Sequence, residues 1–164
     1  MLKPDSLREA LTAAIRAADG ELLLRREPDV LRIYIDRGRL VAHLGASRGY
    51  EWRYRLTGTL IGFTAPPDAL ALPLLEWIRV HQPDLLLNHD RAKEAVPFEI
   101  DVVDDKTVDV EFSLELTETV VATPREDGGF DLVHLPEPPV DPYLDGLDSA
   151  PGLEEIFAGG ERVA

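Results

Sequence analysis

The 164-residue sequence contains no cysteine. The chain can therefore form no disulfide framework, no thiolate metal site and no cysteine nucleophile, and it is compatible with a reducing cytoplasm. Long apolar runs are also missing, because the most apolar stretch, residues 69–75, is interrupted by Pro73 and is far too short to span a bilayer. The first residues resemble no secretory signal. We expect a soluble protein that is not exported by a standard route and has no membrane partner.

Basic residues are scarce: 17 lysines and arginines stand against 31 acidic residues, which gives a net charge of -14. This balance argues against a protein that wraps nucleic acid or binds it sequence-specifically, because phosphate contacts need a basic patch. An acidic surface lining a channel would let DNA slide past without sticking, although solubility is the simpler explanation for most of the acids. Apolar residues make up 45% of the chain, enough for one domain with a sizeable core.

The N-terminal segment has the pattern of an amphipathic helix. Ser6-Leu7-Arg8-Glu9 matches a capping box, in which Ser6 accepts from an amide one turn further on and Glu9 reaches back. Asp19-Gly20 is expected to end the helix, since glycine takes a left-handed cap most easily. One apolar stripe runs between these two ends, formed by Leu7, Ala10, Leu11, Ala14, Ile15 and Ala18.

After Pro28-Asp29 the apolar period changes to two, which is typical of half-buried strands. Residues 31–35 alternate in this way. We expect Asp36-Arg37-Gly38 to form a turn and residues 40–44 to begin a second strand. Residues 50–56 then carry Tyr50, Trp52, Tyr54 and Leu56 on one face.

Two glycines, Gly58 and Gly62, are predicted to end this strand region together with Ala65-Pro66-Pro67. Asp68 is then predicted to cap a second helix that runs to about His81. Pro73 would lie near its first turn if the helix began close to Leu72, and Gln82-Pro83-Asp84 would stop it.

The strongest strand pattern in the sequence is the long alternation over residues 108–117. A shorter alternation over residues 98–102 precedes it, and Asp104-Asp105-Lys106 is expected to turn the chain between the two. Residues 126–129 predict a hairpin turn, after which Phe130, Leu132 and His134 form a return strand. This order of elements predicts an α+β fold, a mainly antiparallel sheet packed against two main helices.

From residue 136 the composition changes, and we divide the chain into a domain of residues 1–135 and an extended arm of residues 136–164. The arm holds five prolines, seven acidic residues and one arginine, a net charge of -6. Two explanations for its apolar residues stay open: short docking elements for a partner, or segments that pack back on the domain. The candidate interface residues here are Tyr143, Leu153, Ile156 and Phe157.

The sequence shows no constellation that carries chemistry. The four histidines are scattered without metal-ligand spacing, and neither a dinucleotide-binding nor a phosphate-binding glycine motif is present. No serine lies in a nucleophile elbow, and the paired carboxylates lie where acids are usually solvated. We therefore predict no catalytic residue, no metal and no cofactor.

Surface composition is more informative. The row Tyr50, Trp52 and Tyr54 is more often core than interface, but aromatics and arginines are also enriched at interface centres. Arg53 and Arg55 occupy the other face of the same predicted strand. Contacts between neighbouring copies would explain two arginines in so acidic a protein, and so would intramolecular salt bridges. Arg53, Arg55, Tyr50 and Trp52 are the candidate interface residues of this strand.

Several stretches, in consistent order over residues 1–139, resemble the tail completion protein R family of contractile-tailed temperate phages. The most specific is Met1-Leu2-Lys3-Pro4-Asp5-Ser6-Leu7-Arg8. The others are Pro28-Asp29 with Leu31-Arg32-Ile33, Glu51-Trp52-Arg53-Tyr54, Trp77-Ile78-Arg79 with Gln82-Pro83-Asp84, Leu114-Glu115-Leu116-Thr117-Glu118, and Glu137-Pro138-Pro139.

The resemblance implies a virion structural protein without catalytic residues. It would be assembled in the cytoplasm of the bacterial host and act at the head-proximal end of the tail. By analogy with tail terminators, it would have a tail-terminator-like fold and form a homo-oligomeric ring, with a hexamer favoured. Its partners would be the tail tube or sheath protein and the head-tail connector or neck proteins.

Two rival functions are kept. A hydrolase would act through acidic faces such as Asp109, Glu111 and Glu115. A non-virion assembly chaperone or regulatory binding module would capture one partner through the acidic C-terminal arm. The chaperone would be absent from finished particles, whereas a terminator would be present in a small fixed copy number.

Overall fold

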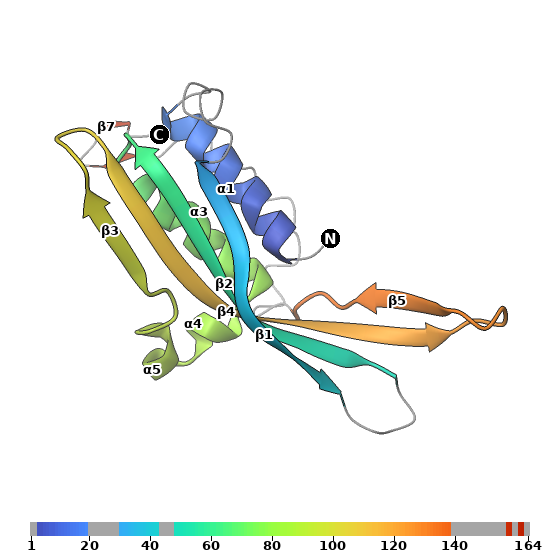
Figure 1. Ribbon diagram of the computed structural model, residues 1–164. Helices are drawn as coiled ribbons and strands as arrows, with labels where there is room; N and C mark the ends of the chain where they lie inside the picture. The colour runs from blue at the N-terminus through green and yellow to red at the C-terminus, as the bar shows by residue number, and fades with distance from the viewer. Residues whose placement is uncertain (1–2, 20–29, 43–47, 139–156, 159–160, 163–164) are drawn as a thin grey trace.

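The computed structural model describes residues 3–19, 30–42, 48–138, 157–158 and 161–162. It has two layers, a five-stranded antiparallel sheet and two long helices that lie together on one of its faces (Figure 1). The predicted α+β class is confirmed. No described helix covers the opposite face of the sheet (Figure 1), which carries exposed side chains such as Arg53 and Glu115.

Helix α1, Lys3–Asp19, buries Leu7, Leu11 and Ile15, which recur every four residues and so lie on one stripe against the core. The helix ends at the predicted position, but it begins four residues earlier than the capping box requires, since that box would make Leu7 the first helical residue. Ser6 lies inside the helix, where its Oγ accepts a hydrogen bond from Trp77 Nε1 at 3.0 Å. The predicted capping box is therefore wrong.

Strands β1, Leu31–Ala42, and β2, Tyr50–Phe63, form a hairpin longer than predicted. The register shifts between Ile35 and Arg37, so the predicted turn at Asp36-Arg37-Gly38 is a bulge that β1 passes through. Residues 40–42 belong to the same strand rather than a new one. The prediction that Gly58 ends the strand is also wrong, because β2 continues to Phe63.

Helix α3, Asp68–His81, is confirmed, and Gln82 is its C-cap. Its N-cap is Pro67 and has no side-chain cap bond, so the predicted capping role of Asp68 is wrong. Pro73 lies in the second turn, because the helix begins four residues before Leu72. Two short helices that the sequence did not predict follow: α4, Asp84–Leu87, and α5, His89–Ala92.

The sheet is completed by β3, Phe98–Val102, β4, Val108–Pro124, and β5, Phe130–His134. The strand order is β1-β2-β4-β3, and β5 pairs with the far end of β4. Both predicted turns are confirmed. The Asp104 carboxylate accepts from the amides of Lys106 and Thr107, and Arg125 N–H donates to the Gly129 carbonyl at 2.9 Å.

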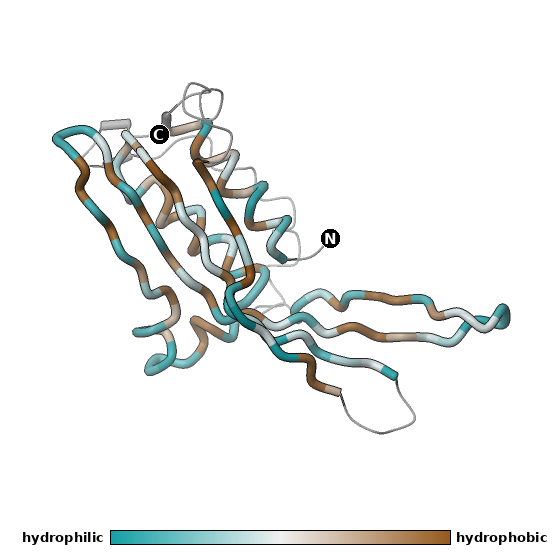
Figure 2. Tube along the Cα trace, in the orientation of Figure 1, coloured by the Kyte–Doolittle hydropathy of each residue, from teal (hydrophilic) through white to brown (hydrophobic). Residues whose placement is uncertain are grey.

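Two hairpin ends extend away from the helix-covered body (Figure 1). We call residues 37–42 with 50–55 the first arm, and residues 120–124 with 130–134 the second arm. The core lies between the helices and the near parts of β1, β2 and β4, where Leu56, Leu114 and Leu116 are almost fully buried. In Figure 2 the apolar positions of the strands continue from this core onto both arms.

Of the candidate residues in the C-terminal arm, Tyr143, Leu153 and Ile156 lie outside the described residues. Phe157 belongs to β6, Phe157–Ala158, which pairs with β7, Glu161–Arg162. The division of the chain at residue 136 stays a prediction.

Candidate interaction site

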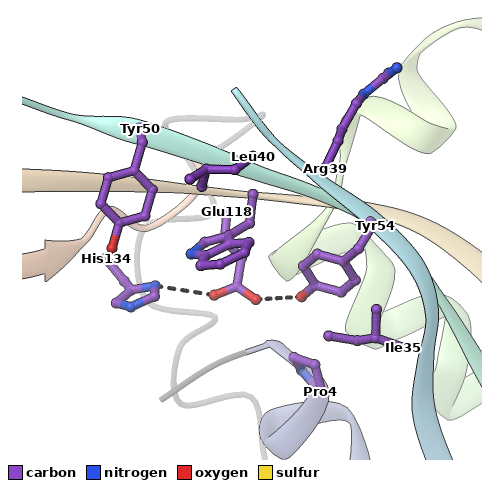
Figure 3. A pocket seen from close by; sticks show the side chains of 10 residues that line it. Pro4, Ile35, Arg39, Leu40, Tyr50, Tyr54, Glu118 and His134 are labelled. Atoms are coloured by element: carbon purple, nitrogen blue, oxygen red, sulfur yellow. Dashed lines mark hydrogen bonds and ion pairs between the residues drawn. The ribbon is translucent and has the colours of Figure 1, made fainter. Parts of the chain in front are cut away.

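A hollow of about 590 Å³ lies where the first arm leaves the body, beside the N-terminus of α1 (Figure 3). Its lining is mainly apolar, with a few polar groups, which is the usual composition of a binding site. The lining residues come from α1 and from four strands, so residues far apart in sequence meet here. They are Pro4, Ile35, Gly38, Arg39, Leu40, Tyr50, Trp52, Tyr54, Glu118 and His134.

The predicted aromatic row contributes to both core and surface. Tyr54 is buried, whereas Trp52 is 42% exposed and its ring meets that of Tyr50 edge to face, with centroids 6.0 Å apart. The row begins under the helices and continues onto the first arm, so no described helix lies above its outer members. Tyr50 and Trp52 therefore present aromatic surface to the hollow.

Glu118 is the most buried acid of the described residues, with 5% of its surface exposed. Its carboxylate accepts hydrogen bonds from the Tyr54 hydroxyl and, at 3.3 Å, from the Lys3 backbone amide. Its second oxygen lies 3.1 Å from His134 Nδ1 (Figure 3). Burial, followed by the hydrogen bond to Glu118 and the charge of that carboxylate, raises the pKa of Tyr54. The phenol therefore stays a neutral donor.

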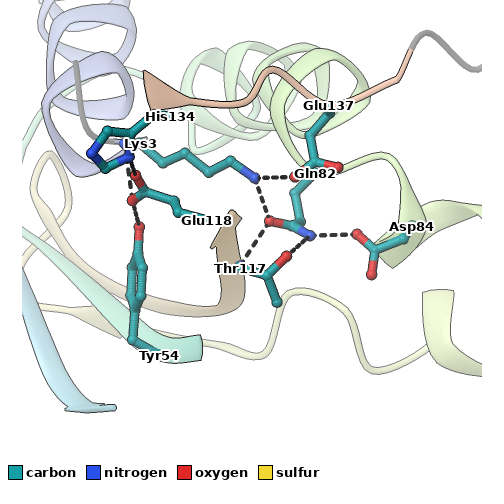
Figure 4. Close-up of polar contacts among 8 residues, drawn as sticks. All are labelled: Lys3, Tyr54, Gln82, Asp84, Thr117, Glu118, His134 and Glu137. Carbon is teal, nitrogen blue, oxygen red and sulfur yellow. Dashed lines mark hydrogen bonds and ion pairs between the residues drawn. The ribbon is translucent and has the colours of Figure 1, made fainter. Parts of the chain in front are cut away.

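A second set of polar contacts adjoins the first through Lys3 (Figure 4). Lys3 Nζ donates to Gln82 Oε1 at 2.8 Å and pairs with Glu137 Oε1 at 2.6 Å. The buried Gln82 side chain also accepts from Thr117 N–H at 3.0 Å and donates to Thr117 Oγ1 and to Asp84. Among the described residues no buried side-chain nitrogen or oxygen lacks a partner. We call these eight residues the junction network: Lys3, Tyr54, Gln82, Asp84, Thr117, Glu118, His134 and Glu137.

The second arm leaves the body at this network. His134 and Glu137 tie β5 and the residues after it to β4 and α1, and Leu135 N–H donates to the Thr119 carbonyl at 2.9 Å. Further out, the Arg48 guanidinium lies over the Phe130 ring, 5.1 Å from its centroid, and so joins the two arms. These contacts fix the direction in which the arms extend.

Arg53 and Arg55 lie on the opposite, open face of the sheet. Arg53 forms a two-point ion pair with Glu51, at 2.7 and 3.1 Å, and Arg55 pairs with Glu115 at 2.7 Å. Hydrogen bonding to Glu51 and its charge raise the pKa of Arg53. Intramolecular salt bridges, one of the two explanations kept for these arginines, are thus present. Exposed ion pairs contribute little stability, so their role in an interface stays a prediction.

Two of the three acids considered for a hydrolase have structural partners. Asp109 Oδ1 accepts from the Gly62 amide at 2.7 Å, and Glu115 is paired with Arg55. Within the described part of the chain, no group of three histidine, aspartate or glutamate side chains is placed to hold a metal ion. No described helix is long and apolar enough to cross a membrane.

The sequence did contain a signal for Glu118, although our prediction missed it. The core-facing positions of β4 continue from Phe112 through Leu114 and Leu116 to position 118, where an acid replaces the expected apolar residue. An acid at a strand position whose side chain points into the core needs buried hydrogen-bond partners. Lys3 and Gln82 carry no comparable signal, because Lys3 contacts Glu118 and Gln82 across 79 or more sequence positions and Gln82 contacts Thr117 across 35.

Comparison with known proteins gives one consistent result. The sequence model of the family described as P2 phage tail completion protein R (GpR) matches residues 1–138. Tail completion protein R of Escherichia phage P2 is 38% identical over 139 residues, which cover 85% of each chain. No solved structure matches. The matched range contains every element from α1 to β5, including both arms and the junction network.

Proposed function

Because the chain belongs to the P2 phage tail completion protein R family and has a role in phage tail assembly, we propose that it completes the tail at its head-proximal end. In this proposal it caps the tail tube or sheath as a ring, with a hexamer favoured, and prepares the tail for joining to the head. The observation that carries the proposal is the family match across both arms and the body that supports them.

A terminator needs two unlike surfaces. A tube of stacked rings grows because each ring exposes the same heterologous surface to the next, so a cap must match that surface on one side and fail to repeat it on the other. This fold supplies such asymmetry. Helices cover one face of the sheet and leave the other open, and both arms extend from one end of the body.

We assign roles to the candidate interface on this basis. The long strands and the open face with Arg53 and Arg55 form ring contacts. The hollow with Tyr50 and Trp52 receives apolar side chains of the tail tube or sheath protein, because it is open and mainly apolar. Residues 136–164 touch neighbours such as the connector or neck proteins through Tyr143, Leu153, Ile156 and Phe157.

Mass spectrometry of purified particles tests this function. We expect the chain in finished tails in a small fixed number of copies per tail. Deleting its gene should leave tails that fail to join filled heads, and the wild-type gene supplied in trans should restore joining. An assembly chaperone acting through the acidic segment after residue 138, which lies outside the family match, predicts the opposite result: a chain needed for assembly but absent from finished particles.

The hollow is tested by Trp52→Ser, with Leu72→Ser on the outer surface of α3 as a control of similar exposure. Removing the indole deletes aromatic contact area at the hollow, so we expect at least a tenfold loss of binding to tail tubes, about 1.4 kcal/mol. Leu72→Ser should bind as wild type does. Co-sedimentation with purified tubes measures binding and circular dichroism checks folding. Equal binding by both folded variants would remove the hollow from the interface.

A further inference from the structure

Charge is unevenly distributed across the sheet. The β1–β2 hairpin, residues 31–63, carries six arginines and two acids, a net of +4 in a chain whose total is -14. Residues 98–118, which include β3 and most of β4, carry eight acids and one lysine, a net of -7. The strand order β1-β2-β4-β3 places these two segments at opposite edges. One edge of the sheet is basic and the other is acidic.

The strand register makes the separation sharper. On the open face, Arg37 lies directly opposite Arg55, and Arg39 lies opposite Arg53. At the other edge, Glu99 lies opposite Glu111, and Asp101 lies opposite Asp109. Like charges directly across a strand pair destabilise it. Arg37 lies 3.9 Å from Glu115, which also pairs with Arg55. Within the described residues no ion pair is formed by Arg39, Glu99, Asp101 or Glu111, so their charges are left for a partner from outside.

The acidic edge also carries uncovered apolar side chains. Phe98, Ile100 and Val102 lie on the helix side of the sheet, because Phe98 is opposite the buried Phe112. They are nevertheless exposed, Phe98 by 65% and Val102 by 70%, since no described helix extends over β3. Figure 2 shows these apolar positions along the outer strand. An exposed apolar edge strand is a ready template for pairing with another strand.

The basic edge, β1, has charged side chains on the open face and an exposed apolar side chain on the helix side, as β3 does, but only over part of its length. The Arg8 guanidinium donates to the carbonyls of Leu31 and Ile33, at 3.3 and 3.0 Å, and so blocks the first part of β1. Residues 37–42, in the first arm, have no such cap among the described residues. They present Arg37 and Arg39 on the open face and Leu40, which is 55% exposed, on the helix side.

We propose that the β3 edge of one copy, Phe98–Val102, pairs with residues 37–42 of β1 in a second copy. Three antiparallel steps separate β1 from β3, so these strands run in opposite directions. Within one copy β3 lies level with Leu31 and Ile33 of β1, so pairing with residues 37–42 needs a shift along the strands as well as a rotation. A rotation axis tilted to the strands supplies both and extends the antiparallel sheet from one copy to the next. On the open face, Arg37 and Arg39 of one copy then lie beside Glu99 and Asp101 of the next. On the helix side, Leu40 lies beside the exposed apolar side chains of β3.

This contact is heterologous, because it uses a different surface on each partner, and each copy keeps one edge free for the next. It deepens the proposed function, since it names the surfaces that would build the ring, and only the closure of that ring rests on the tail-capping role. The association itself is a property of the full chain in solution. It can be tested without tails.

Charge reversal tests the pairing. Glu99→Arg with Asp101→Arg makes both edges basic, and Arg37→Glu with Arg39→Glu makes both edges acidic. We expect wild-type chains to associate as their concentration rises, and each reversed variant alone to stay monomeric. An equimolar mixture of the two reversed variants should co-assemble, with the variants alternating and an even number of copies in each assembly. Sedimentation velocity and native mass spectrometry measure assembly.

Two variants with the same charge changes away from the edges serve as controls. They are Glu126→Arg with Asp127→Arg in the second-arm turn, and Arg79→Glu with Arg91→Glu on the helices; both should associate as wild type does. Wild type that stays monomeric at every concentration overturns the proposal. So does a mixture of folded reversed variants that fails to co-assemble. If either result were obtained and the wild-type protein were still found in finished tails, the proposed tail-completion function would stand and only this contact would be wrong.

A covalent test uses the absence of native cysteine. Asp101→Cys is combined in one chain with a cysteine at Arg37, Arg39 or Val41. The two edges of one copy are at least three strand spacings apart, about 14 Å, which is beyond the roughly 7 Å Cα separation that a disulfide tolerates. Oxidation should therefore produce a ladder of linked copies from at least one of the three variants, and none from Asp101→Cys with Arg79→Cys. No ladder from all three overturns the pairing.

Discussion

Gly58→Ala is expected to destabilise the protein by about 3 kcal/mol, although it adds a single methyl group. Gly58 lies in the middle of β2, directly opposite Phe112 of β4, and the Phe112 ring occupies the space over its Cα. A Cβ at this position would lie 2.2 Å from Phe112 Cζ and 2.5 Å from Cε1, well inside van der Waals contact. The ring would have to leave its buried site. Urea denaturation at neutral pH measures the loss.

A second substitution distinguishes this clash from a general intolerance of the strand. Phe112→Leu removes the ring that meets the new methyl group, so Gly58→Ala with Phe112→Leu should be more stable than Gly58→Ala alone, a non-additivity expected of residues in contact. Gly38→Ala, where a Cβ would meet Tyr54 Cβ at 3.1 Å, should cost clearly less. A Gly58→Ala protein within about 1 kcal/mol of wild type would contradict the close packing.

The same glycine shows where sequence reasoning fails. Alternation of apolar residues correctly predicted the strands around it, because period-two patterns report a half-buried sheet. A glycine within such a pattern is ambiguous, since it can end a strand or admit a close neighbour. The neighbour here is Phe112, 54 positions away, and nothing local reports it. Asp36-Arg37-Gly38 likewise has the local composition of a turn, and only the pairing of β1 with β2 shows that it is a bulge.

The first residue of α1 also depends on contacts with residues distant in sequence. Ser6-Leu7-Arg8-Glu9 has the local chemistry of a helix start, but the helix begins at Lys3, whose amide donates to Glu118. A distant carboxylate thus takes the place of the local cap, and Ser6 is free to accept from Trp77. Apolar periodicity gave the helix and its buried stripe, whereas its first residue depends on tertiary contacts. Helix boundaries are therefore harder to predict from local sequence than helix interiors.

The candidate site was predicted in part. The aromatic row and the arginines of β2 were identified from alternation and charge, and the structure places Tyr50 and Trp52 at the hollow. Alternation cannot say how far the helices extend over a strand, so it did not separate buried Tyr54 from exposed Trp52. The junction network was missed because it joins residues from five parts of the chain, and only Glu118 breaks a local pattern.

Glu118→Ala is the second substitution for which we expect a large effect, a loss of about 3 kcal/mol in the free energy of unfolding. The carboxylate is the common acceptor for the Tyr54 hydroxyl and the Lys3 amide and contacts the His134 ring. Removing it leaves buried donors without a partner, which costs more than the net value of the hydrogen bonds themselves. Glu118→Gln keeps an acceptor of the same shape and should lose about 1 kcal/mol. Urea denaturation gives both values.

The junction network also predicts which part of the structure the loss of Glu118 would destabilise first. His134 lies at the root of the second arm, so its contact with Glu118 holds β5 against the body. In Glu118→Ala, amide hydrogen exchange should rise first in residues 130–134, below the denaturant needed for global unfolding. Glu115→Ala on the open face is the matched control, because its ion pair with Arg55 is solvent-exposed and should cost under about 1 kcal/mol. If the two alanine variants lost equal stability and left β5 equally protected, Glu118 would be one more surface acid, and the arms would owe their direction to strand pairing alone.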